Sequence, residues 1–413
     1  MIPPSSTGQN RSFSHDVIVI GAGPGGSTTA FYLAQAGLNT LLLDKADFPR
    51  DKTCGDGLTP RALHVLAEIG VLDSLAAQGC VMEQATVYAP SGRPISTTMP
   101  DRGDFPPYML AVPRLLLDET IRQQALKAGT QFCGGVHVAD IEPIDGGVRV
   151  RGRRGGKAYE VTGRMAVIAI GASTKLLLQL GLLKEIPPLI LAARTYYEEI
   201  PQLSGQFEFH FDGVPLPGYG WIFPLSAHSA NIGAGLIPSR RQKSTINAKT
   251  ILEQFVAAPF MRQMLAGARQ SGPIKGFPLR TDFATAPVTG PRLLLVGEAA
   301  GLVNPVTGEG VDYALESGKL AAAQLSHCFT AGDFSAAALA GYETALRERF
   351  QELFVFSSRI RDWYINGPVL NRLVYVANQR DNIRELFTDI VLGNADASRA
   401  TSLKTLSQIA FTL

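Results

Sequence analysis

The residues with the clearest chemical potential form a glycine cluster between two apolar segments. Gly21-Ala-Gly23-Pro-Gly-Gly26 follows residues 16–20 (DVIVI), which predict a buried strand, and precedes residues 27–36, which predict a small-residue helix. In this arrangement Gly21 permits a tight turn, Gly23 lets the backbone approach a pyrophosphate, and Gly26 lets the helix pack close to the sheet. The helix N-terminus adds N–H donors and a partial positive charge, so the cluster indicates a phosphate-binding loop. A glycine-rich turn without a ligand is the alternative.

An acidic residue stands where such a loop needs a partner for ribose. Residues 40–43 (TLLL) predict a second buried strand, and Asp44 ends it eighteen positions after Gly26. A carboxylate at this place accepts hydrogen bonds from a ribose hydroxyl of an adenine dinucleotide, and the adjacent Lys45 is a further expected contact. Strand, turn, helix and strand within about thirty residues form a βαβ unit. The unit predicts an adenine dinucleotide without deciding between NAD and FAD.

Two segments far downstream have the residues to hold the rest of a flavin. Residues 292–296 (RLLLV) predict another buried strand, and the Gly-Glu298 after it resembles a fingerprint of FAD-binding proteins in which a strand ends in Gly-Asp. There the acid binds the ribityl chain, and Glu298 is one methylene longer. Gly308-Glu309-Gly310 precede a long helix predicted for residues 311–329, whose N-terminus is suited to stabilise the negative charge of a reduced flavin. An ordinary helix start is the alternative.

Three further segments carry the motifs of one enzyme family. They are Pro49-Arg-Asp-Lys52-Thr-Cys54-Gly55, similar to P-x-x-K-x-C-G; Tyr219-Gly-Trp221-Ile-Phe223-Pro224, which fits Y-x-W-x-F-P; and Asn304-Pro305 with Gly308-Glu309-Gly310 and Glu316-Ser317-Gly318. Together they resemble the geranylgeranyl reductase family of FAD-dependent enzymes, in the p-hydroxybenzoate-hydroxylase superfamily. Arg114 and Asp118 also resemble the superfamily's Arg…Leu-Asp helix start, whose arginine contacts the diphosphate region of FAD. The likeness extends over residues 15–330.

The resemblance implies an FAD-dependent reductase that saturates C=C bonds of a geranylgeranyl or other prenyl chain on a lipid, quinone or chlorophyll-type acceptor. The residues expected to bind FAD are Gly21, Gly23, Gly26, Asp44, Lys45, Cys54, Gly55, Arg114, Glu298, Gly308, Glu309 and Gly310. One departure concerns the electron donor. The superfamily has an Ala-Asp-Gly segment where this chain has Gly171-Ala-Ser-Thr174, and there is no second G-x-G-x-x-G motif. NADPH and reduced ferredoxin therefore both stand as donors.

The substrate is expected on an aromatic strand. Tyr219, Trp221 and Phe223 alternate along the chain, so their side chains point to one face, where they suit an apolar substrate. The same rings could instead form a core between the sheet and a helix. Cys54 could be a weak acid beside the flavin or an inert buried thiol. With Tyr219 and Trp221, it is an expected catalytic group.

The elements that must position these residues predict an α/β protein, α+β overall. A Rossmann-like FAD-binding domain with a mostly parallel sheet is expected from residues 15–84, 108–185 and 287–340. An antiparallel-sheet substrate domain is expected from residues 85–107 and 186–286, since residues 192–237 alternate and are rich in aromatics. Residues 1–14 are expected to be a disordered leader. Residues 341–413 predict C-terminal helices that cap the substrate, lie against a membrane surface or simply pack.

Three local predictions concern the middle of the first domain. Residues 115–128 predict a helix that ends at Gly129. A hairpin is predicted around the Gly/Arg-rich turn at residues 152–156. Residues 165–170 predict another buried strand.

Composition excludes several classes of protein. The 413 residues suffice for two or three domains, and the net charge of 38 − 36 = +2 gives no basis for binding nucleic acid through its phosphates. No run of about 18 apolar residues predicts a membrane span. The four cysteines are widely spaced, which argues against a zinc site or disulfide scaffold and fits a reducing compartment. We expect a cytoplasmic protein, with peripheral membrane contact an option. Oligomeric state is not predicted.

Two other functions fit parts of the pattern. One is a flavin-dependent monooxygenase or halogenase of the same superfamily. A halogenase is expected to carry Trp-x-Trp-x-Ile-Pro, whereas this chain has Tyr219 and Phe223 at the first and fifth positions. The other is a non-catalytic flavin-binding protein, with which the segment Gly171-Ala-Ser-Thr174 and the unusual Glu298 would be compatible.

Overall fold

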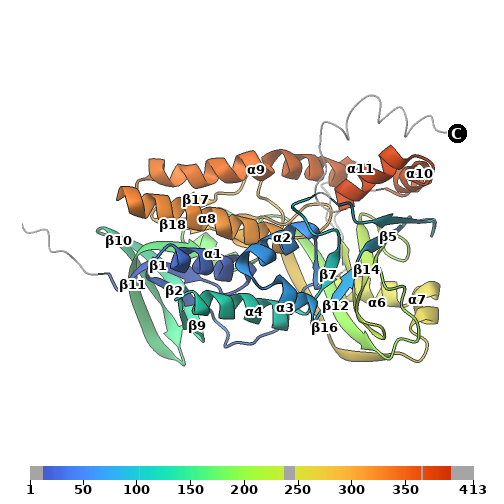
Figure 1. Ribbon diagram of the computed structural model, residues 1–413, viewed down its shortest axis with the longest axis horizontal. Helices are drawn as coiled ribbons and strands as arrows, with labels where there is room; N and C mark the ends of the chain where they lie inside the picture. Colours follow the sequence, from blue (N-terminus) through green and yellow to red (C-terminus); the bar gives the residue numbers. More distant parts are fainter. Residues whose placement is uncertain (1–12, 102, 237–246, 364–365, 392–413) are drawn as a thin grey trace, which may run out of the picture.

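The computed structural model describes residues 13–101, 103–236, 247–363 and 366–391 (Figure 1). Residues 1–12 of the expected leader and residues 392–413 of the expected C-terminal helices lie outside the described residues. Within the described residues, the strands form an eight-stranded, a seven-stranded and a three-stranded sheet. Helices lie against the two larger sheets, so the α/β class with α+β character is confirmed.

The first sheet has a parallel centre of buried strands. Its main order is β17-β18-β11-β1-β2-β8, and all neighbours from β18 to β8 run parallel. The bounds are β1 His15–Ile20, β2 Thr40–Leu43, β8 Gln131–Cys133, β11 Lys157–Ile168, β17 Thr289–Gly290 and β18 Leu293–Leu295. Every residue of β2 and β18 is buried, as expected for strands covered on both faces. The predictions for residues 16–20 and 40–43 are therefore confirmed.

The predicted strand at residues 165–170 is not separate from the hairpin. The hairpin pairs β10, Gly147–Arg154, with the first half of β11, and β9, Val136–Ile144, extends it. The second half of β11 then pairs in parallel with β1. Gly163 belongs to both ladders, opposite Val148 on one side and His15 on the other. The predicted buried strand is therefore confirmed for residues 165–168, and it continues the hairpin strand because the backbone stays extended and hydrogen-bonded through this glycine.

A layer of helices covers the first sheet. It contains α1 Pro24–Gln35, α2 Pro60–Ile69, α3 Leu72–Ala76, α4 Arg114–Lys127 and α8 Val311–Ala331, with α9 Ala336–Trp363 outside α8 (Figure 1). Helix α1 packs between α4 and α8. A Cβ on Gly318 of α8 would lie 2.6 Å from the carbonyl oxygen of Gly25 of α1, so glycine permits this close approach. The expected helices at residues 115–128 and 311–329 are thus confirmed.

The second sheet supplies the other wall of the site. Its order is β16-β12-β15-β14-β13-β5-β6. The bounds are β5 Gln84–Tyr88, β6 Pro94–Thr98, β12 Leu189–Glu198, β13 Phe207–His210, β14 Gly218–Ser226, β15 Ser229–Leu236 and β16 Arg269–Arg280. Neighbours are antiparallel except β13 and β5, which run parallel because β5 enters from a distant part of the chain. Helices α6 Ala248–Val256 and α7 Pro259–Met264 complete this half.

Small elements connect the two halves. The third sheet has the order β3-β7-β4, with β3 Gly57–Leu58, β4 Cys80–Met82 and β7 Met109–Ala111. Helix α5 spans Lys175–Gln179, and the 3₁₀ helix η1 spans Gly297–Ala300. Strand β3 carries the loop that contains Cys54 toward the second sheet: a Cβ on Gly57 would lie 2.8 Å from the ring of Phe207.

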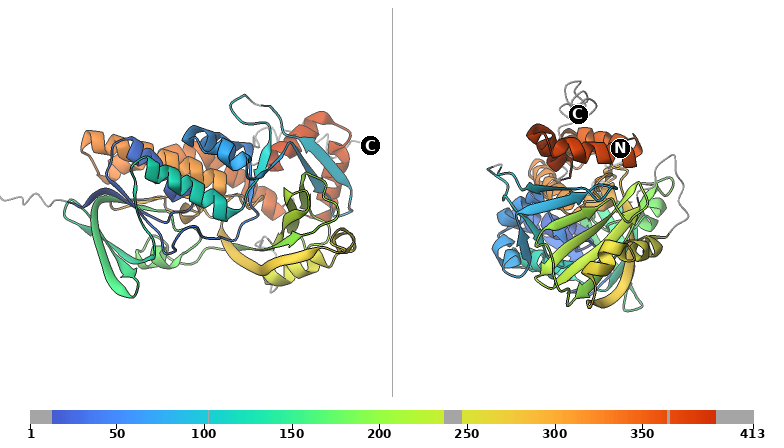
Figure 2. Two further views of the ribbon diagram at one scale, coloured as in Figure 1. Left: turned by 60° about the horizontal axis from the view of Figure 1, so that its bottom comes forward. Right: turned by 90° about the vertical axis from the view of Figure 1, so that its right-hand side faces the viewer.

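The C-terminal helices pack on the edge of the second sheet. Helices α10, Gly367–Ala377, and α11, Asp381–Val391, lie above this sheet in the right-hand view of Figure 2. Val374, Ile383 and Phe387 are buried against Val87 and Ile95 of the sheet. Packing against the sheet therefore accounts for the buried apolar residues of α10 and α11. None of the helices in the described ranges has both the length and the apolar character to cross a bilayer.

Candidate functional site

A cavity of about 990 Å³ lies at the carboxyl ends of the parallel strands and extends to the aromatic face of the second sheet. This is the edge at which open α/β sheets bind ligands, and the volume is at the upper end of the usual range of about 300–1,000 Å³. Every expected FAD contact except Gly26 lines it, as do Tyr219, Trp221 and Phe223. The cavity therefore brings together segments that are far apart in the sequence, from Ile20 to Ala314, including β14.

The three glycines of the first motif have different surroundings. Gly21 has φ +106°, and a Cβ there would lie 2.3 Å from the carbonyl oxygen of Ala169. A Cβ on Gly26 would lie 1.8 Å from the carbonyl oxygen of Gly21, so this glycine lets α1 pack against the turn. A Cβ on Gly23 would meet only guanidinium nitrogens, of Arg50 at 3.6 Å and Arg114 at 3.9 Å. Gly23 thus lies beside two cations, whose N–H groups suit the oxygens of a diphosphate.

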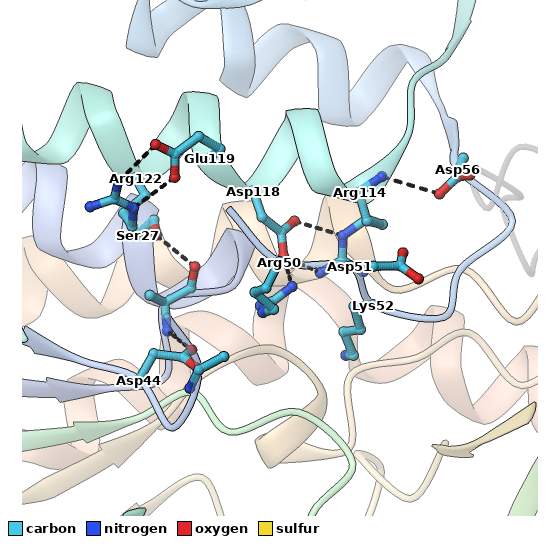
Figure 3. Close-up of polar contacts among 12 residues, drawn as sticks. Ser27, Asp44, Arg50, Asp51, Lys52, Asp56, Arg114, Asp118, Glu119 and Arg122 are labelled. Carbon is cyan, nitrogen blue, oxygen red and sulfur yellow. Dashed lines mark hydrogen bonds and ion pairs between the residues drawn. The ribbon is translucent and has the colours of Figure 1, made fainter. Parts of the chain in front are cut away.

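Asp44 holds the glycine turn as well as lining the cavity. Its Oδ2 accepts a hydrogen bond from the backbone N–H of Ala22 at 2.7 Å, and Oδ1 accepts one from Ala46 at 2.8 Å (Figure 3). Each oxygen keeps a further lone pair for a ribose hydroxyl. The neighbouring Lys45 is exposed at the rim of the cavity.

Asp44→Ala is expected to weaken FAD binding by about 10- to 150-fold, which corresponds to about 1.5–3 kcal/mol for charge-assisted hydrogen bonds. The measurement is the dissociation constant of FAD from the apoprotein by flavin fluorescence. Asp47→Ala, which removes an exposed carboxylate three positions away, is the matched control and should leave the constant nearly unchanged. Equal constants for wild type and Asp44→Ala would mean that Asp44 does not contact the cofactor.

A buried carboxylate fixes both guanidinium groups beside Gly23. Asp118 accepts hydrogen bonds from Arg114 Nε at 2.6 Å and Nη2 at 2.8 Å, and from Arg50 Nη1 at 2.5 Å (Figure 3). Burial alone would raise the pKa of Asp118, but the charges and hydrogen bonds of Arg114, together with the charge of Arg50, hold it below its usual value. Sequence reasoning missed Arg50, although it lies in the motif that contains Cys54.

A second buried carboxylate fixes the loop that carries Cys54. Asp56 accepts hydrogen bonds from Asn231 Nδ2 and the Tyr196 hydroxyl, each at 2.8 Å. Burial raises the pKa of Asp56 to about 6, although these two hydrogen bonds act to lower it. Asn231 also donates to the carbonyl oxygen of Cys54 at 2.8 Å and accepts from Trp221 Nε1 at 3.0 Å. The Cys54 loop and the aromatic strand are therefore one hydrogen-bonded unit, and no motif pointed to Asn231 or Tyr196.

The aromatic residues of β14 form both a wall and a core. The Trp221 ring centroid lies 6.0 Å from that of Tyr219 and 6.2 Å from that of Phe223, so the three share one face as predicted. Trp221 and Phe223 are 7% and 8% exposed, belong to a cluster with Phe207, and still line the cavity. The two interpretations drawn from sequence therefore both apply. The Tyr219 hydroxyl donates to the carbonyl oxygen of Thr307, which commits its proton to the protein and not to a substrate head group.

The far end of the cavity contains Glu298 and the start of α8. Glu298 accepts a hydrogen bond from the Arg280 backbone N–H at 3.2 Å and pairs with Lys52 Nζ at 3.5 Å. Gly308 has φ +68°, a conformation that favours glycine, and lies beside the Tyr219 hydroxyl. Gly171, in the segment that lacks the superfamily's acid, also borders Lys52 and Glu298.

The residues present fit FAD. Two fixed guanidinium groups lie beside Gly23, Asp44 ends the second strand at the position that binds ribose in this type of motif, and the first turn of α8 lines the same cavity. Among the described residues, no three His, Cys, Asp or Glu side chains gather into a possible metal site.

Known families and proteins match this chain over most of its length. Residues 14–188 match the FAD binding domain family, and residues 193–267 match the geranylgeranyl reductase catalytic domain. The chain is 35% identical over 315 residues to a menaquinone reductase of Mycobacterium tuberculosis, covering 75% of this chain and 76% of the relative. It is 29% identical over 385 residues to digeranylgeranylglycerophospholipid reductase 1 of Methanopyrus kandleri, covering 90% and 96%.

A solved structure agrees with this grouping. The crystal structure of a geranylgeranyl bacteriochlorophyll reductase-like protein from Thermoplasma acidophilum matches with a TM-score of 0.73 and 25% identity, over 96% of each chain. Fold and site define an FAD-dependent oxidoreductase. The chain belongs to the geranylgeranyl reductase family, as its motifs predicted.

Proposed function

We propose that this protein, with FAD bound, saturates C=C bonds in the prenyl chain of a quinone or another lipid. The observation that carries the proposal is the aromatic face of β14, which lines the same cavity as the residues that fit FAD. Among the acceptors, a quinone is favoured by the similarity to the menaquinone reductase of M. tuberculosis and a lipid by that to the M. kandleri enzyme.

The chain's own residues have three tasks in this reaction. When bound and reduced, FAD supplies a hydride. Arg50, Arg114 and the Gly23 backbone hold the diphosphate, and the hydrogen bond from Tyr219 to Thr307 ties the start of α8 to the aromatic strand. Trp221 and Phe223 bury the prenyl chain and exclude water from the reacting carbons, which keeps them oriented.

The test is an anaerobic incubation of photoreduced holoenzyme with geranylgeranyl lipids and prenylated quinones, followed by mass spectrometry. A gain of two hydrogen atoms per reduced bond supports the proposal. No gain with any acceptor, together with a hydroxylated or halogenated product in a parallel incubation with oxygen, would replace it with the monooxygenase or halogenase alternative. Protein that binds no FAD would contradict every flavin-dependent function. Parallel incubations with NADPH and with reduced ferredoxin identify the donor.

Peripheral membrane contact forms part of the proposal, since a prenyl lipid must enter from a lipid phase. The measurement is co-sedimentation of the holoenzyme with vesicles that contain the identified acceptor, compared with vesicles that lack it. If the protein is cytoplasmic and makes peripheral contact with membranes, it should sediment with the vesicles that contain the acceptor. It should stay in solution with the vesicles that lack the acceptor.

Trp221→Ala is expected to lower kcat/KM for the prenyl substrate at least tenfold, since it removes a ring that can bury about 150–250 Å² against an apolar chain. The flavin absorption spectrum should change little. Trp221→Phe, which keeps a ring but loses the hydrogen bond to Asn231, is the companion variant and should retain more activity. If Trp221→Ala unfolds while Trp221→Phe retains full activity, Trp221 serves the core and not the substrate.

A further inference from the structure

The proposed reduction needs a proton as well as a hydride. One alkene carbon accepts the hydride, and the other must accept a proton. In a cavity walled by aromatic rings, a positioned acid is the expected source. If prenyl reduction is the function, as proposed above, the cavity wall should therefore carry a group that is protonated near neutral pH.

Glu309 is a carboxyl group in that wall. It lies between Gly308 and Gly310 at the start of α8, in a loop whose hydrogen bond to Tyr219 fixes it beside the aromatic strand. Its backbone is held on both sides, since its N–H donates to the Thr307 hydroxyl at 3.3 Å and its carbonyl accepts from Asn304 at 2.8 Å. The Oε2 atom is shielded from solvent and has no hydrogen-bond partner among the described residues.

A second carboxyl group adjoins it. Asp312 is fully buried, and its Oδ1 accepts a hydrogen bond from the Tyr313 backbone N–H at 2.8 Å. Its Oδ2, like Glu309 Oε2, has no hydrogen-bond partner in the part of the chain that the structure describes. Two acids whose outer oxygens are buried and unbonded are most stable when they hold at least one proton between them.

The charges around the pair agree with this protonation. Burial raises the pKa of Glu309 and the charge of Asp312 raises it further, while Arg61 and the Thr59 hydroxyl only partly oppose both effects. Burial likewise raises the pKa of Asp312 to about 7. The other titratable groups that interact with the pair among the described residues are Tyr219 on β14 and Tyr313 and Glu316 on α8. Glu316 in turn pairs with Arg349 on α9 at 3.1 Å.

We propose that Glu309 is the catalytic acid of prenyl reduction and that Asp312 restores its proton. As one alkene carbon accepts the hydride, the π electron pair forms a C–H bond at the other carbon with the proton of the Glu309 carboxyl, whose O–H bond breaks. The negative charge stays on the Glu309 carboxylate, which then takes a proton from Asp312. Asp312 in turn is reprotonated from water after product leaves.

Two other side chains compete for this role. The Tyr219 proton is donated to the Thr307 carbonyl, and burial raises the pKa of Tyr219, so the hydroxyl is a poor acid here. The Cys54 thiol also lines the cavity and is therefore included as a variant in the test. Glu309 differs from both in having a buried, unbonded oxygen beside a second acid.

The test measures single turnovers of photoreduced holoenzyme with a prenyl substrate by stopped flow. Glu309→Gln is expected to slow the first turnover by about 10²–10⁴-fold, the usual contribution of a general acid. Asp312→Asn should retain the single-turnover rate and slow steady-state turnover, which is measured in the presence of the electron donor. Glu343→Gln is the control, because Glu343 lies on α9, pairs with Arg347 at 3.3 Å and does not line the cavity; it should stay within about fivefold of wild type.

Two outcomes of the kinetics would overturn the proposal. One is a Glu309→Gln variant that matches wild type in rate and pH profile. The other is a loss confined to Cys54→Ser. The wild-type rate should fall as pH rises through the pKa of the pair, because only the protonated pair can donate. A flat wild-type profile contradicts the proposal even if Glu309→Gln fails to fold.

A spectroscopic readout separates this proposal from the function itself. Oxidised wild-type holoenzyme at neutral pH should show infrared C=O bands of protonated carboxyl groups, and one of these bands should be missing from the spectrum of Glu309→Gln. Identical carboxyl bands in wild type and variant place the proton elsewhere and overturn the assignment, whatever the substrate. If the band is lost but no prenyl lipid is reduced by wild type, Glu309 holds the proton and the proposed function is what fails.

Discussion

Asp118→Ala is expected to lower the free energy of unfolding by about 3–5 kcal/mol, the usual cost of removing one partner from a buried ion pair. The variant keeps Arg114 buried without the carboxylate that receives two of its N–H groups. It also frees Arg50, so the two cations that face Gly23 lose their positions and FAD binding should fall with stability. Urea unfolding of the apoprotein gives the first quantity, and flavin fluorescence gives the second.

A surface ion pair provides the control for this prediction. Glu253 pairs with Lys249 on α6, and both side chains are more than half exposed. Glu253→Ala should therefore change the free energy of unfolding by about 0.5 kcal/mol or less. An equally small change for Asp118→Ala would mean that water reaches the cluster and that Asp118 does not stabilise the fold.

The cost of Asp118→Ala should depend on pH in a defined direction. The pKa of Asp118 is lower in the folded protein than in the unfolded chain. Its contribution is therefore complete above the unfolded value of about 3.9, and it is lost as pH falls through the lower folded value. The difference in stability between wild type and variant should shrink on acidification, and a difference that grows in acid contradicts the assignment.

Local sequence patterns were sufficient to predict the parts of the fold that depend only on residues close together in the chain. The buried strands at residues 40–43 and 293–295 and the glycine turn between β1 and α1 follow from apolar runs and from glycine geometry. The alternation of Tyr219, Trp221 and Phe223 gave their common face, because strand geometry is itself local.

The contacts that complete the site join residues far apart in the chain. Arg50 and Asp118 are 68 positions apart, and Asn231 and Asp56 are 175 positions apart. No rule of sequence spacing predicts either contact, because the order of the strands in the sheets brings these residues together and their separation along the chain does not. The parallel pairing of β5 with β13 is of the same kind. Sequence could therefore name Arg114 and Cys54 through motifs, but not the residues that hold them in place.

Gly26→Ala is expected to destabilise the protein by about 3 kcal/mol, at the upper end of the cost of overpacking. The new Cβ would lie 1.8 Å from the carbonyl oxygen of Gly21 and 3.1 Å from the Cβ of Ala169. Since both obstacles are backbone or short side chain, α1 has to move as a whole. That movement displaces the N–H groups at the start of the helix, so FAD binding should be lost as well.

Gly23→Ala separates packing from cofactor binding. Gly23 has φ −74°, which alanine adopts without strain, and its Cβ would meet only the flexible ends of Arg50 and Arg114. We therefore expect the free energy of unfolding of Gly23→Ala to lie within about 1 kcal/mol of the wild-type value. FAD should nevertheless bind poorly, because the methyl group occupies the space for the diphosphate. Urea unfolding and flavin fluorescence on both variants test the pair. Tight FAD binding by Gly23→Ala would show that the diphosphate lies elsewhere, since only a ligand close to that backbone is excluded by one methyl group.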